Sequence, residues 1–310
     1  MLSFGIDSSN YRSSAAVVFD DLSFESQRKL LLVENGKCGL RQSDAVFLHT
    51  RQLPGVVKSV LEKIDTRDIC SIGVSSSPRR QEGSYMPCFL SGIALAETMG
   101  ASLGVPVFKF SHQEGHIAAA LLSAGRCDLF DKQFLALHLS GGTTEILLVT
   151  PSKQGFECEI IGRTLDLNAG QVIDRVGVML GLDFPSGMYL EKLAEKGQPV
   201  KGIKPCIKGF DCALSGVENI CQRLFKEKES PENIAATAME YVISTVCQMV
   251  SSVADKHIHL PFVFSGGVMA NKLLRSRLEN IVESNFASTE LSGDNAVGTA
   301  LLARRSMENL

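Results

Sequence analysis

Short apolar runs alternate along the chain with longer stretches in which apolar residues recur at helical spacing. The short runs predict strands over residues 2–7, 15–19, 71–75, 107–110, 134–139, 145–149 and 262–264. The longer stretches predict helices over residues 52–63, 89–103, 112–124, 172–180, 231–254, 271–281 and 294–307. Strands that alternate with helices in this way indicate an α/β fold.

Composition places the chain among globular proteins with a sizeable core. Its 310 residues are 45% hydrophobic and 21% charged, which excludes a disordered chain, a collagen-like fibre and a disulfide-rich miniprotein. The length suits two domains of about 150 residues each. Because 31 basic residues nearly balance 34 acidic ones, the net charge of −3 gives no overall field that attracts nucleic acid or an anionic membrane.

The cysteines and the apolar segments bear on localisation. Nine scattered cysteines without a CxxC pair are typical of reduced thiols in the cytosol rather than of a disulfide framework. The first residues lack the basic and apolar segments of a secretory signal. The most apolar stretch, residues 92–108, carries Glu97 and is interrupted by glycines and a proline, so we expect no membrane span. The expected location is the cytoplasm.

Three segments of small polar residues follow predicted strands. Segments 140–142 and 265–267 both read Ser-Gly-Gly, and segment 7–9 reads Asp-Ser-Ser. Glycines in such loops let backbone N–H groups approach an anion, and hydroxyls add donors. The loops could line one cleft at the ends of the strands, or each could be only a tight turn. The signatures of P-loop NTPases, of NAD-binding Rossmann folds and of α/β-hydrolases are missing from the sequence.

The segment His112-Gln-Glu-Gly-His116 is the most informative short motif. Residues four apart on a helix lie on one face, about 5–6 Å apart at Cβ, so both imidazoles could bind one metal. Glu114 is turned about 200° away from His112 and cannot act as the general base of an HExxH protease. A third ligand must come from elsewhere, and Asp294 is a candidate. The alternative is a helix start with two surface histidines. His257 and His259 lie two residues apart beside a predicted strand, which is typical of ordinary loop residues.

Several motifs together resemble the TsaD/Kae/Qri family, whose members were formerly called glycoproteases or M22 peptidases. The resemblance rests on HQEGH at 112–116, LSGG at 139–142, DRVGVMLGLDFPSG at 174–187, SGGVMAN at 265–271 and DNA at 294–296. Met86-Pro87 and the following helix to Pro106 also match. The order and spacing of the motifs agree over nearly the whole chain.

The resemblance implies an actin/sugar-kinase/Hsp70-like (ASKHA) fold, in which two α/β lobes hold a nucleotide in the cleft between them. We expect one lobe over residues 1–131 with the C-terminal helix 294–310, and the other over 132–293. The implied reaction transfers a threonylcarbamoyl group from threonylcarbamoyl-AMP to N6 of the adenosine beside the anticodon of tRNA. The chain would be a divergent second copy of such an acyltransferase, without protease chemistry. Implied partners are a smaller protein of related fold (TsaB-like), a P-loop ATPase (TsaE-like) and a second copy in a homodimer.

The resemblance also assigns site residues. The family's metal ligands, which bind iron or zinc, fall on His112, His116 and Asp294. The family's contacts to the adenylate substrate fall on His138, Leu139, Ser140, Gly141, Gly142, Asp174, Gly187 and Asn271. A metal held by two imidazoles and a carboxylate keeps open positions at which it could polarise the carbamoyl carbonyl. The glycine amides suit the phosphate, a carboxylate suits the ribose hydroxyls, and an amide suits a base or ribose edge.

This sequence departs from the family pattern at several positions. The acidic pair that usually follows the first strand is replaced by Tyr11 and Arg12. Thr143 replaces a histidine, and Leu167 and Gln171 replace acidic residues. In the family's S-G-L-K segment, Glu218 reverses the charge. These changes concern base catalysis and RNA contact more than binding of a metal or nucleotide.

Three hypotheses of function therefore stand side by side. The intact metal-ligand set favours an active transferase, and the lost acidic pair favours a non-catalytic scaffold or partner subunit of the transfer complex. A small-molecule carbamoyl or phosphoryl transferase is supported only by the loops. The lysines between residues 192 and 208 and at 226 and 228 alternate with glutamates, which favours a solvated helical face over an RNA-binding surface.

Overall fold

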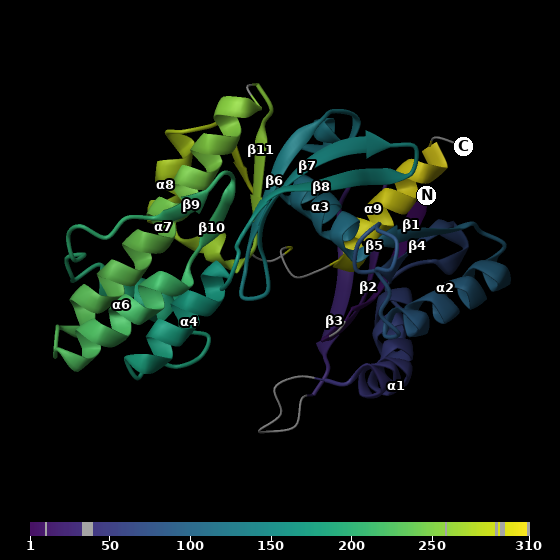
Figure 1. Ribbon diagram of the computed structural model, residues 1–310. Helices are drawn as coiled ribbons and strands as arrows, with labels where there is room; N and C mark the ends of the chain where they lie inside the picture. Colours follow the sequence, from purple (N-terminus) through teal and green to yellow (C-terminus); the bar gives the residue numbers. More distant parts are fainter. Residues whose placement is uncertain (10, 33–39, 258, 289–290, 292–294, 309–310) are drawn as a thin grey trace. The chain divides into compact units, whose positions relative to one another are not determined.

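The computed structural model describes residues 1–9, 11–32, 40–257, 259–288, 291 and 295–308. The chain divides into two compact units, whose elements are labelled in Figure 1. Unit 1 comprises Met1–Lys132, Thr150–Cys158 and Glu290–Leu310, and unit 2 comprises Gln133–Val149 and Glu159–Thr289. Each unit contains a five-stranded sheet with helices, so the predicted α/β class is confirmed.

Unit 1 contains a sheet of order β3-β2-β1-β4-β5. Its strands are β1 (Leu2–Ser9), β2 (Arg12–Val18), β3 (Phe24–Leu30), β4 (Ile69–Ser77) and β5 (Val107–Ser111). Its helices are α1 (Gln42–Leu61), α2 (Phe89–Leu103), α3 (His112–Ser123) and α9 (Asn295–Glu308), with short 3-10 turns at Thr66–Asp68 and Cys127–Asp131. β1 pairs antiparallel with β2 and parallel with β4.

The two faces of this sheet are covered in different ways. Phe4 and Ile6 of β1 are fully buried and share a core cluster with Leu53 of α1. On the other face Gly5 and Gly73 leave room for α9: a Cβ at Gly5 would lie only 1.9 Å from the carbonyl oxygen of Ala296. Bare glycine backbone therefore lets α9 lie directly on the sheet.

Unit 2 contains a sheet of order β12-β11-β6-β7-β8. Its strands are β6 (Phe134–Leu139), β7 (Thr144–Ser152), β8 (Gly155–Arg163), β11 (Phe262–Ser265) and β12 (Ser284–Phe286), beside the small hairpin of β9 (Cys206–Lys208) and β10 (Asp211–Ala213). Its helices are α4 (Ala169–Met179), α5 (Gly187–Ala194), α6 (Ser215–Lys226), α7 (Pro231–Lys256) and α8 (Lys272–Glu279), with a 3-10 turn at Gly267–Ala270. β11 runs parallel to β6 and β12, and β7 runs antiparallel to β6.

Helix α7 is the central helix of unit 2. Ile234, Val242, Val246 and Val250 along its length are buried in one core cluster with the strands β6 and β11. Among the described residues α7 alone is long and apolar enough to cross a membrane by length and composition, but 72% of its apolar window is buried inside the protein. Its apolar character is explained by this core.

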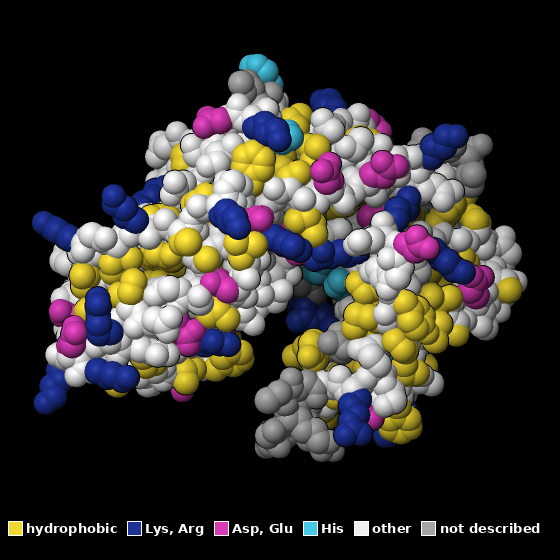
Figure 2. Space-filling model, in the orientation of Figure 1, with side chains coloured by type: hydrophobic (Ala, Val, Ile, Leu, Met, Phe, Trp, Pro, Cys, Tyr) yellow, Lys and Arg dark blue, Asp and Glu magenta, His cyan; other side chains and the backbone are white. Residues whose placement is uncertain are grey.

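The elements that sequence analysis misplaced have local explanations. α1 begins at Gln42, ten residues before the predicted start at residue 52. A proline is typical of the first turn of a helix, but Pro54 lies inside α1. Residues 7–9, predicted as a loop, continue β1 and pair with β2. The predicted helical face for the lysines is also wrong: most of that stretch is a loop and the strand β9. On the face of unit 2 that Figure 2 shows, lysines and arginines are scattered among acidic and apolar side chains.

Candidate functional site

Helix α3 begins with a capping box that fixes the two histidines. The Ser111 hydroxyl accepts a hydrogen bond from the Glu114 N–H at 3.2 Å, and the Glu114 carboxylate accepts one from the Ser111 N–H at 2.8 Å. The helix starts at His112 and carries His116 one turn later. Their ring centroids lie 4.6 Å apart in an edge-to-face arrangement, so the structure brings the predicted pair together.

Glu114 points away from the histidine pair, as the helical geometry predicts. It is fully buried, accepts a hydrogen bond from the Phe156 N–H at 3.0 Å and forms an ion pair with Arg80 at 3.1 Å. The carboxylate thereby joins the start of α3 to the first residues of β8, which belong to unit 1. Its role in the structure is to anchor the helix that presents the histidines.

His112 contacts a carboxylate that sequence analysis did not identify. Its Nδ1 lies 3.0 Å from Oδ1 of Asp7, which is only 2% exposed. Burial alone raises the pKa of Asp7, but the charge and hydrogen bond of His112 outweigh it and hold that pKa well below its usual range. The side-chain amide of Asn295, at the start of α9, also contacts the His112 ring.

The third predicted ligand, Asp294, lies outside the described residues. Within the ranges that the structure describes, no three His, Cys, Asp or Glu side chains form a group that could hold a metal ion. The described part of the site therefore supplies two imidazoles. Beside them, the side-chain oxygen of Asn295 is buried without a hydrogen-bond partner.

In unit 2, the predicted loop residues lie at the carboxyl ends of the two neighbouring strands β6 and β11. His138 at the end of β6 and Ser265 at the end of β11 are neighbours in the parallel register, and their side chains are 2.9 Å apart. Leu139 ends β6 and the whole residue is buried, so the structure gives the predicted ligand contact at Leu139 no exposed group. Both Ser-Gly-Gly segments lie at these strand ends. The carboxyl ends of the strands are where α/β sheets bind ligands.

The first Ser-Gly-Gly segment is a hairpin turn that remains open on one side. The Ser140 hydroxyl accepts hydrogen bonds from the N–H groups of Gly142 and Thr143 at 3.2 and 3.1 Å. An added Cβ at Gly141 or Gly142 would meet no atom within 4 Å. The turn lies against the N-terminus of α4, since a Cβ at Gly170 would be 2.6 Å from the Gly141 nitrogen.

The second Ser-Gly-Gly segment has a structural reason for its glycine. Gly266 has a φ of 97°, and an added Cβ would lie 2.1 Å from the Leu139 carbonyl oxygen. Gly267 is open, with nothing within 4 Å. The tight-turn interpretation therefore accounts for Gly266 but not for the open glycines.

Asp174 and Gly187 are adjacent through one hydrogen bond. Asp174 Oδ1 accepts from the Ser186 N–H at 2.7 Å, which places the start of α5 beside α4. A Cβ at Gly187 would meet only Ile173, at 3.8 Å. Packing within the protein therefore does not require this glycine, and the space next to it is available to a ligand.

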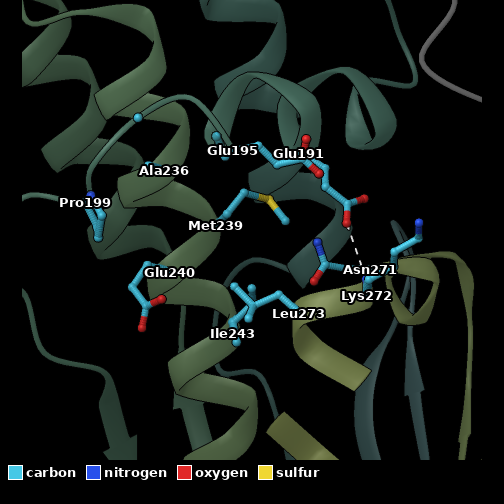
Figure 3. A pocket seen from close by; sticks show the side chains of 12 residues that line it. Glu191, Glu195, Pro199, Ala236, Met239, Glu240, Ile243, Asn271, Lys272 and Leu273 are labelled. Carbon is cyan, nitrogen blue, oxygen red and sulfur yellow. Dashed lines mark hydrogen bonds between the residues drawn. The ribbon is translucent and has the colours of Figure 1, made fainter. Parts of the chain in front are cut away.

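Asn271 both caps α8 and lines a pocket. Its Oδ1 accepts a hydrogen bond from the Leu274 N–H at 2.8 Å, and the residue is 6% exposed. The pocket has a volume of about 330 Å³ and is shown in Figure 3. Its walls come from α5, α7 and the start of α8, and are formed by Glu191, Ala194, Glu195, Gly197, Pro199, Ala236, Met239, Glu240, Ile243, Asn271, Lys272 and Leu273.

Glu191 is a residue of this pocket that sequence analysis missed. It lies four residues after Gly187, on the same face of α5, and this spacing is the signal that could have identified it. Its carboxylate accepts a hydrogen bond from the Lys272 N–H at 3.3 Å, which is the dashed line beside Asn271 in Figure 3. Asn271 and Glu191 thus flank one side of a pocket whose lining also contains Glu195, Glu240 and Lys272 beside apolar residues.

Comparisons with known proteins agree with the motif series. A family model described as TsaD, tRNA N6-adenosine threonylcarbamoyltransferase, matches residues 35–301. The protein of that name from Methanopyrus kandleri is 27% identical over 303 residues, covering 95% of this chain and 84% of its own. The one from Nanoarchaeum equitans is 30% identical over 254 residues, covering 80% of this chain and 74% of its own.

Solved structures show the same fold at low sequence identity. HypF of T. kodakarensis has a TM-score of 0.65 at 16% identity, covering 99% of this chain and 47% of its own. The ROK hexokinase of Thermus thermophilus has a TM-score of 0.54 at 14% identity, with complete coverage of both chains. The predicted ASKHA fold is confirmed, and the predicted acyltransferase class agrees with the names of the relatives. This chain belongs to the TsaD family of tRNA N6-adenosine threonylcarbamoyltransferases.

Proposed function

We propose that this chain transfers the threonylcarbamoyl group of threonylcarbamoyl-AMP to N6 of the adenosine beside the anticodon of tRNA. The observation that carries the proposal is the pocket of about 330 Å³ with Asn271 in its wall, in a chain whose residues 35–301 match the family. Pockets for small ligands measure about 300–1,000 Å³, so the volume suits a nucleoside.

The adenosine moiety of the substrate is assigned to this pocket. Met239 and Ile243 of α7 supply apolar walls, and the Asn271 amide and Glu191 carboxylate supply polar contacts to a base or ribose edge. Asn271 Oδ1 is occupied by the Leu274 N–H, so the Nδ2 donors are the groups that meet the ligand. Asp174 uses Oδ1 for Ser186, and Oδ2 accepts from a ribose hydroxyl.

The phosphate is assigned to the open turn at residues 140–142. The turn lies at the N-terminus of α4, where backbone N–H groups and the helix dipole favour an anion. The amides of Gly142 and Thr143 now bond to the Ser140 hydroxyl, and a phosphate oxygen would replace that hydroxyl as their acceptor. Gly187 leaves space for the ribose.

His112 and His116, with Asp294 as the third ligand, are proposed to hold one divalent iron or zinc ion. The two imidazoles suit such a metal, and the unpartnered buried oxygen of Asn295 would accept a hydrogen bond from a group bound there. When bound, the metal supplies Lewis-acid polarisation of the carbamoyl carbonyl. His112 and His116 would hold the metal in position. The amides of the turn at residues 140–142 would hold the phosphate of the adenylate, which leaves as AMP.

Further parts of the assignment are proposals of the same kind. The lobes are assigned to residues 1–131 with 294–310 and to residues 132–293, although residues 150–158 group with unit 1. Two relatives are named as bifunctional tRNA threonylcarbamoyladenosine biosynthesis proteins and match over about half of their own length, which supports work in an assembly with TsaB-like and TsaE-like partners. The free described cysteines support a cytoplasmic location.

A scaffold function has one observation in its favour. Tyr11 and Arg12 stand where the family has its acidic pair, and Tyr11 is 45% exposed at the turn between β1 and β2. A phenol and a guanidinium do not accept the proton that the attacking amine must lose at neutral pH. A chain that binds the adenylate without transferring its acyl group would fit this replacement.

The deciding experiment measures AMP release from threonylcarbamoyl-AMP with and without unmodified tRNA, together with the modified base in the tRNA. The related partner and the ATPase are included so that a missing subunit does not cause an inactive result. Release of AMP with modified tRNA supports the transferase. Tight adenylate binding without transfer supports the scaffold, and release with another acceptor supports a different transferase.

Binding by the pocket is tested separately. Asn271→Ala should weaken adenylate binding at least tenfold, since a hydrogen bond to a buried partner contributes about 1.5 kcal/mol. Asn280→Ala is the matched control, because Asn280 ends the same helix and lies outside the pocket lining. Equal affinity of both variants would remove Asn271 from the site.

A further inference from the structure

Asp7 is the carboxylate that the structure adds to the histidine pair. It lies in β1, 105 residues before His112 in the chain, and its side chain is buried. Its two oxygens have separate partners: Oδ1 lies 3.0 Å from Nδ1 of His112, and Oδ2 accepts from the Ser9 N–H at 3.3 Å. The bond to Ser9 fixes the orientation of the carboxylate and hence the oxygen that faces the imidazole.

The position of His112 is fixed from the other side by α9. A Cβ at Gly115 would lie 3.2 Å from the Asn295 carbonyl oxygen, so the first turns of α3 and α9 touch through a glycine. The Asn295 amide donates to the His112 carbonyl oxygen at 3.0 Å. The imidazole is thus held between a carboxylate in the sheet and a helix start, and its ring has little freedom to rotate.

Two groups compete for Nδ1 of His112, and their chemistry decides the tautomer. Asp7 can only accept a hydrogen bond when ionised, whereas the Asn295 nitrogen can only donate one. A hydrogen bond to a charged acceptor is about twice as strong as a neutral one. One of the two Asn295 N–H groups donates to the His112 carbonyl oxygen, and this bond does not depend on the tautomer of the ring.

We propose that Asp7 is the positioning residue of the metal site: it accepts the Nδ1 proton of His112 and leaves the Nε2 lone pair for the metal. This inference rests on the proposed metal site at His112 and His116. A carboxylate behind a ligating histidine fixes its tautomer and ring orientation and makes it a stronger ligand. Loss of such a partner lowers metal affinity about 10–100-fold.

The first test observes the tautomer in the metal-free wild-type protein. Long-range proton–nitrogen correlation spectra of protein with ¹⁵N-labelled histidine separate the two neutral tautomers, and the His112→Ala spectrum assigns the signal. The expected result is a proton on Nδ1 of His112. A neutral ring with its proton on Nε2 and none on Nδ1 overturns the proposal, and this test requires no variant of Asp7 that folds.

The second test compares zinc affinities by competition with a chelator. Asp7→Asn should bind zinc 10–100-fold more weakly than wild type and should move the proton of His112 toward Nε2, because an amide can donate to Nδ1. Glu114→Gln is the matched control, since Glu114 is also buried, lies on the same helix and does not contact His112. Because this control also weakens the anchoring of α3, it should lose less zinc affinity than Asp7→Asn and should keep the wild-type tautomer of His112.

The outcomes separate this inference from the proposed metal site. If wild type binds no zinc, or His112→Ala binds as tightly as wild type, the metal site itself is refuted. If wild type binds zinc, His112→Ala does not, and Asp7→Asn matches wild type in affinity and tautomer, only the role of Asp7 is refuted. An equal loss in Asp7→Asn and Glu114→Gln also refutes it, because the effect would then be general damage to α3.

Discussion

The contact between α3 and α9 depends on glycine, which makes Gly298→Ala a sharp test of the packing behind the histidine pair. A Cβ at position 298 would lie 1.8 Å from the Gly115 carbonyl oxygen, 2.7 Å from its carbonyl carbon and 3.0 Å from the Ala119 nitrogen. All three atoms belong to backbone, so no side chain can turn aside. Since carbon and oxygen normally meet at about 3.3 Å, the two helices must separate by about 1.5 Å.

The size of the effect follows from two opposing contributions. Overpacking of a well-packed interior costs about 1–3 kcal/mol, and a clash with three backbone atoms belongs at the upper end. Alanine recovers about 1 kcal/mol of helix propensity relative to glycine. The expected net loss is about 2 kcal/mol, which lowers the melting temperature of a unit of this size by about 4–8 °C.

The matched control is another helical glycine. Gly55 lies on the exposed side of α1, and an added Cβ there would meet nothing within 4 Å. Gly55→Ala should therefore stabilise unit 1 by up to about 1 kcal/mol. Thermal denaturation followed by circular dichroism compares both variants with wild type. If Gly298→Ala is as stable as Gly55→Ala, the close approach of α3 and α9 is refuted.

Two further predictions concern pH and the ribose site. His49 is fully buried, and burial lowers its pKa, so the unfolded chain binds a proton more readily than the folded chain. The free energy of unfolding should therefore fall as the pH drops below about 6.5. His49→Gln should reduce this dependence of the unfolding free energy on pH, as measured by urea titrations at several pH values. An equal slope in both proteins would contradict this. Gly187→Val should keep the melting temperature of the wild type, but it should weaken adenylate binding at least tenfold in an equilibrium titration. The valine side chain would fill the open space beside Ile173. A variant that binds the adenylate with wild-type affinity would exclude a ligand at this position.

Sequence patterns located the elements whose apolar residues form a clear run or recur at helical spacing. The strand at residues 134–139 and the helix at residues 89–103 have the predicted bounds, and the helix ends at Gly104 in a left-handed C-cap. β3 was missed because it is an edge strand of polar, exposed residues. α6 was overlooked although its buried positions, Val217, Cys221 and Leu224, recur at helical spacing among charged and polar residues.

The site was predictable only where its geometry is local. The spacing of His112 and His116 indicates one helix face, and the structure places the rings together. Asp7 was not predictable as their neighbour, because its contact joins residues 105 positions apart through the pairing of β1, β4 and β5. The pocket at Asn271 likewise depends on how α5, α7 and α8 pack, which no short motif encodes.

The departures from the family pattern are best understood by what the replacing residues contact. Gln171 accepts a hydrogen bond from the Asn168 N–H at 3.0 Å and completes the capping box of α4. Glu218 forms an ion pair with Arg175 at 3.1 Å in the groove between α4 and α6. Both residues therefore stabilise unit 2, whereas Tyr11 is exposed at a turn. The proposed adenylate contacts do not involve Gln171, Glu218, Tyr11 or Arg12, so these replacements leave binding of the adenylate available. Among them, positions 11 and 12 concentrate the difference between an active and a silent relative. The rate of acyl transfer, measured where the adenylate is bound equally well, is thus the quantity that separates the two functions.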